Sequence, residues 1–214
     1  MLTMMSVLFH GLESLLQYAV VCPIFFLLEW LLCRLYRRQG IAYGKGFVVG
    51  WQLLMLLLTA MFCFTGTAGV EDVWRFGTSL LANDGICATV ADRLTAEMLL
   101  NLLLFVPLGV LLPLLWNNHG ALQNVVCGFL LSMLIECSQL FNHRASDIND
   151  LLMNTIGICL GYGIFLLFFR RMAVFQAQTA DKLTIAAMGS IGLAFACYVL
   201  LASPLWTWLL MRLY

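Results

Sequence analysis

The chain has 214 residues, of which 63% are hydrophobic and 10% are charged, and its mean hydropathy is +0.96. A soluble domain carries roughly 25% charged residues, so this composition excludes a water-soluble globular protein and indicates an integral membrane protein. The formal net charge is zero, and the 11 Lys and Arg residues are scattered among the connections, which argues against nucleic-acid binding.

Six apolar stretches are long enough to cross a hydrocarbon core, which takes about 20 residues of helix. We therefore predict an all-α fold, a polytopic transmembrane bundle of about six helices that forms a single domain over residues 1–214. The helices are expected at about Leu15–Tyr36, Phe47–Phe64, Glu97–Trp116, Ala121–Phe141, Asp147–Phe169 and Leu183–Ala202. The aromatic tail, 203–214, is expected to lie at the membrane interface without spanning it.

Charge placement predicts the orientation of these helices. If the N-terminus is outside, the inner connections carry Arg34, Arg37, Arg38, Lys45, Arg170, Arg171 and Lys182, against Arg75, Arg93, Arg144 and Arg212 outside. The rule that cytoplasmic connections are richer in Lys and Arg then predicts a multi-pass protein of the cell membrane with both termini outside. It also places Arg144 and Asp147 outside, and Asn118 and Arg170 in the cytoplasm.

Several single residues in the helices have ordinary structural interpretations. Glu29 is expected to pair with Arg34 at the inner end of the first helix, with both side chains reaching the interface. Pro107 and Pro113 are expected to kink the third helix and to free backbone carbonyls. Most cysteines lie in apolar runs and are interpreted as small buried hydrophobes. His10, His119 and His143 share no metal-ligand spacing, which argues against a zinc site.

Polar residues interrupt the apolar pattern at one end of the third, fourth and fifth helices. They are Glu97 and Asn101, then Glu136 and Gln139, then Arg144, Asp147, Asp150 and Asn154. On the fifth helix, Asp147, Asp150, Asn154, Gly157 and Gly161 fall within an arc of about 80°, at about 100° per residue. A helix with such a stripe turns its polar face inward and its apolar face to lipid, so we predict a polar cleft among these helices.

The predicted cleft holds more carboxylates than cations. Burial and like-charge repulsion would protonate one carboxyl, or a bound cation would supply the balance, with Asp147 and Asp150 as ligands for a divalent cation. Each residue also has a plainer interpretation. Asp147 would cap the helix, Asn154 would form an interhelical hydrogen bond, and Gly157 and Gly161 would allow close helix packing. Glu136 is the strongest functional candidate, as a carboxyl embedded in the membrane.

Three blocks in this order resemble the VanZ-like family. They are Asn101-x3-Phe105-x-Pro107-x-Gly109, then Glu136-x2-Gln139, then Arg144-x2-Asp147-x2-Asp150-x3-Asn154-x2-Gly157, and they cover a core of about 97–161. The family is named for a membrane protein that gives bacteria low-level resistance to teicoplanin, a lipidated glycopeptide that acts outside the cytoplasmic membrane. The resemblance implies a cell-envelope role on the outer face, and it supplies no reaction.

Three functions are compatible with these residues. The leading hypothesis is a module that binds or shields an envelope lipid, a lipid-linked precursor or a lipoglycopeptide in an outward cleft, with membrane lipids around it. The alternative is a membrane enzyme that modifies a lipid-linked substrate, with Glu136 as general acid or base and a divalent cation at Asp147 and Asp150. Ion or proton coupling through Glu136 ranks third, because no titratable row continues into the inner half of these helices.

Overall fold

The computed structural model describes residues 4–76, 86–87, 96–116, 120–141, 146–172, 175, 177–178 and 183–213. Its elements, in chain order, are α1 (Met4–Arg38), β1 (Ala42–Tyr43), α2 (Phe47–Thr65), α3 (Val70–Phe76), β2 (Ile86–Cys87), α4 (Ala96–Leu115), α5 (Ala121–Gln139), β3 (Ser146–Asp147), α6 (Ile148–Ile164), η2 (Phe165–Phe169), β4 (Ala177–Gln178), α7 (Leu183–Cys197), η4 (Tyr198–Ala202) and α8 (Ser203–Leu213). The segments η2 and η4 are π-helical and continue α6 and α7.

The part of the chain described here contains six helices long and apolar enough to cross a membrane, which confirms the predicted all-α bundle. The main difference is at α1, which begins at Met4 and runs for 35 residues, well before the expected start at Leu15. At 1.5 Å per residue such a helix is about 52 Å long, against about 30 Å of hydrocarbon. Its first turns escape a search for apolar runs because they contain His10, Glu13 and Gln17.

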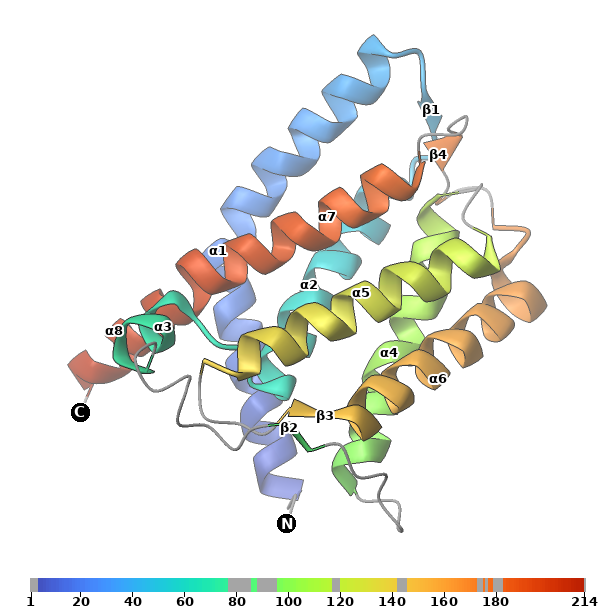
Figure 1. The fold of residues 1–214 in the computed structure, drawn as a ribbon. Coiled ribbons are helices and arrows are strands. Elements are labelled where there is room, and N and C mark those ends of the chain that lie inside the picture. Colours follow the sequence, from blue (N-terminus) through green and yellow to red (C-terminus); the bar gives the residue numbers. More distant parts are fainter. Residues whose placement is uncertain are drawn as a thin grey trace.

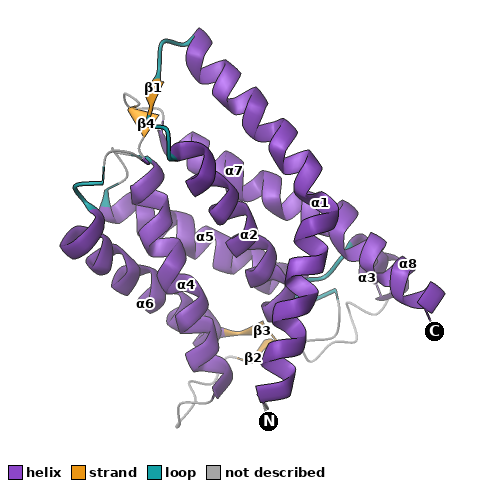
Figure 2. Cartoon of the chain, turned by 180° about the vertical axis from the view of Figure 1, so that it is seen from behind, coloured by secondary structure: helices purple, strands orange, loops and turns teal. Residues whose placement is uncertain are grey.

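Helix α2 lies between α1 and α4 and also packs against α7, and it is the most deeply buried of the spanning helices (Figures 1 and 2). Its side chains Trp51, Leu54, Leu58 and Phe62 are at most 1% exposed. The outer surface is also apolar, since large side chains such as Leu103 and Leu167 are 62% and 78% exposed. A buried apolar centre and an apolar exterior together are what a helix bundle surrounded by lipid requires.

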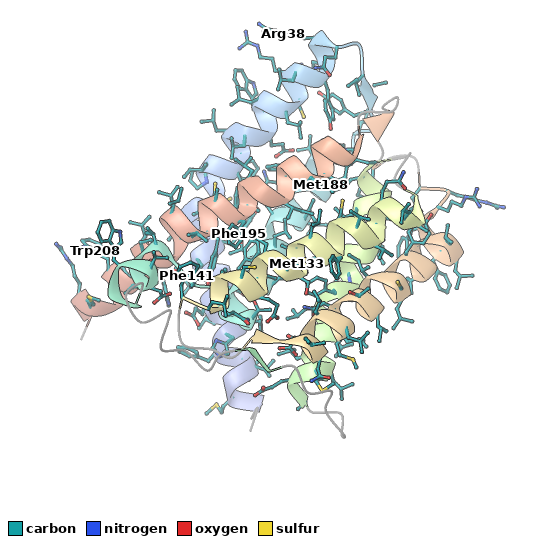
Figure 3. All side chains as sticks on the ribbon, in the orientation of Figure 1. Arg38, Met133, Phe141, Met188, Phe195 and Trp208 are labelled. Atoms are coloured by element: carbon teal, nitrogen blue, oxygen red, sulfur yellow. The ribbon has the colours of Figure 1, made fainter. Side chains whose placement is uncertain are left out.

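Two short strand pairs mark the two ends of the bundle (Figure 1). Strands β1 and β4 pair antiparallel beside the end of α1 that carries Arg38, and β2 and β3 pair in parallel near the N-terminus. Figure 3 shows Arg38 and Phe141, which follows α5, at opposite ends of the molecule. We call the end with β2 and β3 the N-terminal end and the other the β1–β4 end.

The aromatic tail forms helix α8, which continues the line of α7 and η4. Its Ser203 and Thr207 hydroxyls donate to Oε1 of Glu71 on α3, so the two short helices are held together at the N-terminal end. Trp208 is 52% exposed and points away from the bundle (Figure 3), and the Arg212 guanidinium lies 4.2 Å from its ring centroid. Exposed indole beside a cation suits the headgroup region, and the interfacial position stays a prediction.

Candidate functional site

Glycines bring α4 and α6 into backbone contact and fix the register of the site. A Cβ atom added to Gly157 would overlap the Leu102 carbonyl oxygen, and one added to Gly161 would overlap that of Val106. Along this line of contact, which we call the seam, the residue numbers increase in the same direction on both helices, so α4 and α6 run parallel. The interpretation of Gly157 and Gly161 as packing residues is therefore confirmed.

An interhelical hydrogen bond joins α5 to α6 next to this seam. The Asn154 Nδ2 donates to the Ser132 Oγ at 2.8 Å, and both side chains are buried. This is the interhelical bond expected for Asn154, and it fixes which turns of the two antiparallel helices face each other. The Asn154 Oδ1 is buried and has no hydrogen-bond partner. One side of the carboxamide thus holds the helices together while the other keeps an unused acceptor.

One turn further toward the N-terminal end, this register brings Glu136 and Asp150 to the same level. Glu136 is 8% exposed and Asp150 is half-buried, and both have interactions within the protein. Gln139 is also buried, and its Nε2 donates to the Thr65 carbonyl at the end of α2, at 2.7 Å. The predicted inward face of α5 is therefore buried, and the end of α2 contributes a backbone carbonyl to the same region.

The remaining predicted site residues lie at the same end with different surroundings. On α4, Asn101 is half-buried and Glu97 is exposed, because the buried position in this first turn belongs to Met98. The Asp147 backbone pairs with Cys87 in the β2–β3 ladder. The Asp147 side chain, and Arg144, Arg93 and His143 entirely, lie outside the described residues. We name the described members, Asn101, Glu136, Gln139, Asp150 and Asn154, the polar cluster.

The polar residue missed by the sequence reasoning on α6 is Asn149, which is 2% exposed. It directly precedes Asp150, so a stripe drawn at four-residue spacing passes beside it. The apolar face of α6 is as predicted, with Ile148, Leu152 and Ile156 exposed to the surroundings of the bundle. The signal that would have found Asn149 is the rarity of a carboxamide at the start of an apolar run.

Another buried carboxamide, Asn124, contacts helix α4. Pro113 has no N–H, so it leaves the Gly109 carbonyl, four residues earlier, without its helical donor. The Asn124 Nδ2 donates to this carbonyl oxygen at 3.0 Å, and Asn124 is 0% exposed. The expectation that Pro113 frees a backbone carbonyl is thus confirmed, and the structure identifies the side chain that compensates for it.

The expected pairing of Glu29 with Arg34 is wrong. Five residues along a helix correspond to a rotation of about 140°, so the two side chains point to different faces. Glu29 is 3% exposed and accepts a hydrogen bond from Gln52 on α2, whose Oε1 accepts from Tyr18 at 2.7 Å. Arg34 instead lies 5.2 Å from the ring centroid of Trp30.

Charged side chains segregate between the two ends. Among the side chains described, the N-terminal end carries the carboxylates Glu13, Glu71, Asp72, Glu97, Glu136 and Asp150 with one cation, Arg212. The β1–β4 end carries the cations Arg34, Arg37, Arg38, Lys45, Arg170 and Arg171, with the buried Glu29 on the half of α1 nearer to it. A hollow of about 620 Å³ lies on η2, at the opposite end of α6 from the polar cluster. It is lined by residues 166–168 and by Arg170 and Arg171. Among the described side chains, carboxylates therefore outnumber cations at the end of the bundle that holds the polar cluster.

Comparisons with known proteins agree with this helical region. The model of the VanZ/LLP1 family matches residues 52–169, which run from α2 to the end of η2. The match therefore includes α2, for which the three sequence blocks showed no resemblance. The uncharacterized membrane protein YwnJ of Bacillus subtilis (strain 168) is 38% identical over 63 residues, which are 29% of this chain and 45% of that protein. No solved structure matches the chain. Since the family match covers more than half of the 214 residues, the chain belongs to the VanZ/LLP1 family.

Proposed function

We propose that this VanZ-like membrane protein binds or shields a lipidated molecule of the cell envelope at the polar cluster. The candidate ligands are an envelope lipid, a lipid-linked precursor and a lipoglycopeptide of the teicoplanin type. The observation that carries the proposal is the burial of Glu136, at 8% exposure, beside the half-buried Asp150 on family-matched helices. Glu136 lies in the last turn of the spanning helix α5, and an ionisable side chain within a membrane-spanning segment is a functional-site hypothesis by default.

The charge of the cluster limits how a ligand would be held. Carboxylates and carboxamide oxygens accept hydrogen bonds from ammonium, amide and hydroxyl groups, which glycopeptides carry. A phosphate group would instead need a divalent cation between itself and the carboxylates. The apolar faces of α4 and α6, with Leu103 and Leu152 exposed, would lie beside the ligand's acyl chain.

The predicted outward position of the N-terminal end supports an encounter with envelope molecules there. That orientation follows from the Lys and Arg placement and stays a prediction. If it is correct, the cluster lies in the leaflet where lipid-linked cell-wall precursors are exposed to glycopeptides.

The test compares drug susceptibility with binding by the same variants. Expressed in a susceptible bacterium, the unmodified chain should raise the inhibitory concentration of teicoplanin. Asp150→Asn and Glu136→Gln should abolish that increase at equal membrane abundance. Asp72→Asn is the matched control, because Asp72 lies at the same end on α3 and only accepts from the Gly69 N–H, at 2.9 Å. Unchanged susceptibility in both cluster variants would refute the role of these carboxyls.

A binding measurement separates this function from the enzymatic alternative. Protein in lipid nanodiscs should retain teicoplanin or a lipid-linked precursor in native mass spectrometry, and the Asp150→Asn protein should not. Formation of a covalently altered lipid on incubation with envelope lipids and Mg²⁺ would instead support an enzyme that uses Glu136 and a cation at Asp147 and Asp150. If the protein neither retains a ligand nor converts a lipid, both functions are contradicted.

A further inference from the structure

A second group of chemically reactive side chains lies outside the polar cluster, where the first turns of α1 meet the end of α2. The His10 Nδ1 lies 3.2 Å from the Glu13 Oε2. One imidazole nitrogen of His10, one carboxylate oxygen of Glu13 and the Cys63 Sγ all lie within 4.8 Å of one another. Helical spacing places His10 and Glu13 on one face of α1, and helix packing adds the thiol from α2. We propose that these three residues form a zinc-class metal site.

The separations fit a tetrahedral ion. Zinc binds imidazole and carboxylate at about 2.0–2.2 Å and thiolate at about 2.3 Å, so neighbouring ligand atoms lie about 3.3–3.6 Å apart in a tetrahedron. The distance between the His10 Nδ1 and the Glu13 Oε2, 3.2 Å, is just below this range. The Cys63 Sγ lies 3.8 Å from the His10 backbone carbonyl oxygen, so the thiol already points at this turn of α1. A shift of about 1 Å completes the three-ligand set.

A buried carboxamide supports the ligand carboxylate from behind. The Gln17 side chain is 3% exposed, and its Nε2 donates to the Glu13 Oε1 at 3.3 Å. This bond leaves the other carboxylate oxygen directed to His10, as the outer hydrogen bonds of metal-ligating carboxylates do. The Gln17 Oε1 is buried and has no hydrogen-bond partner. A plain His–Glu hydrogen bond would not require either feature.

The surroundings of the three ligands differ in a way that suits a bound ion. Cys63 is 7% exposed, whereas the His10 side chain is 40% and the Glu13 side chain 17% exposed, so the ion could enter past the imidazole. The Phe64 ring lies 5.8 Å from the His10 ring, centroid to centroid, and packs the imidazole against α2. A divalent ion with one carboxylate and one thiolate is electrically neutral, which limits the cost of burial at a membrane interface.

The types of ligand atom determine which class of metal the site prefers. A thiolate and an imidazole prefer zinc and its neighbours in the first transition row, whereas magnesium and calcium prefer sets of oxygen ligands. Three protein ligands leave a fourth position for water, which is the arrangement of zinc sites that are not closed structural sites. The site is therefore distinct in location and in metal preference from the divalent-cation site predicted at Asp147 and Asp150.

Zinc content and cobalt spectroscopy test the proposal on the full chain, purified in detergent after removal of any histidine tag. The protein should retain one zinc per chain after dialysis, and cobalt substitution should give a thiolate-to-cobalt charge-transfer band. Cys63→Ser should lose the band, and His10→Ala and Glu13→Gln should lose the stoichiometric zinc. Gln17→Met should weaken zinc binding by about 10–100-fold, the usual effect of losing an outer hydrogen bond. Cys159→Ser is the matched control, since Cys159 is exposed on α6.

A variant that exchanges one ligand for a thiolate keeps the test decisive if Cys63→Ser fails to fold. His10 lies on an exposed part of α1, so His10→Cys should fold, retain zinc and give about twice the charge-transfer intensity per cobalt. Failure of the wild-type protein to retain zinc, or a cobalt band that survives Cys63→Ser, would overturn the proposal. An increase of zinc affinity with no thiolate band in His10→Cys would do the same, since the ion would then lie elsewhere.

Discussion

The hydrogen bond between Asn124 and Gly109 makes a prediction that a single pair of substitutions can isolate. Asn124→Leu removes the donor that serves the Gly109 carbonyl, which Pro113 leaves without a helical partner. Leaving a buried carbonyl unpaired costs about 1–3 kcal/mol in proteins, and interhelical hydrogen bonds in membranes are worth about 0.6 kcal/mol on average and about 1.7 at most. The Asn124 Oδ1 has no partner, so its removal offsets part of the cost. We expect a loss of about 1 kcal/mol.

Pro113→Ala provides the control, because it restores an N–H group that can donate to the Gly109 carbonyl within α4. In this background Asn124→Leu should cost less than about 0.3 kcal/mol, so the double-mutant cycle should show a coupling of at least about 0.7 kcal/mol. The measurement is reversible unfolding in mixed detergent and lipid micelles, with the free energy of unfolding taken for all four proteins. Equal costs in the two backgrounds would refute the assignment of Asn124 to the freed carbonyl.

Three further predictions concern packing, topology and the acidic site. Gly161→Ala should lower the free energy of unfolding by about 1–3 kcal/mol, because the new methyl group would meet the α4 backbone, including the Gly109 Cα at 2.8 Å. Gly163→Ala is the control and should be nearly neutral, since a Cβ there has nothing within 4 Å. Equal costs for the two variants would contradict the close contact between α4 and α6. In a protein without native cysteines, Trp74→Cys should react with an impermeant maleimide in intact cells and Lys45→Cys only after permeabilisation, and the reverse pattern would invert the predicted orientation. Magnesium should raise the melting temperature, and Asp147→Asn with Asp150→Asn should remove the increase; a shift that persists in the double variant would exclude this cation site.

The spanning helices were predictable because lipid imposes a simple length rule on apolar segments. The rule failed at the start of α1, where His10, Glu13 and Gln17 interrupt the apolar run although the helix continues through them. Their polar groups contact one another and α2, so the local hydropathy does not reflect their surroundings. The hydropathy of a segment indicates whether it could face lipid, and only the packed structure shows which groups surround it.

The helices that carry the polar cluster, and its end of the bundle, were predictable, since spacing along α5 and α6 determines which residues share a face. The position of individual side chains was not, because it depends on helix rotation and on packing partners. Glu97 is exposed while Met98 is buried, and Gln139 bonds to the end of α2, which no spacing within α4–α6 could indicate. The His10, Glu13 and Cys63 group was missed for the same reason, since its thiol comes from another helix and a comparison of histidines alone does not include it.

The backbone contact between α4 and α6 also restricts how a lipid-anchored molecule could reach the polar cluster. At Gly109, Gly157 and Gly161 the two helices approach so closely that a single added methyl group would overlap the neighbouring backbone. An acyl chain is wider than a methyl group, so this seam is closed to lateral entry from the bilayer. A lipid-anchored ligand of the proposed kind would therefore reach the cluster from the membrane surface or along a boundary of α5, with its hydrocarbon outside the closed pair.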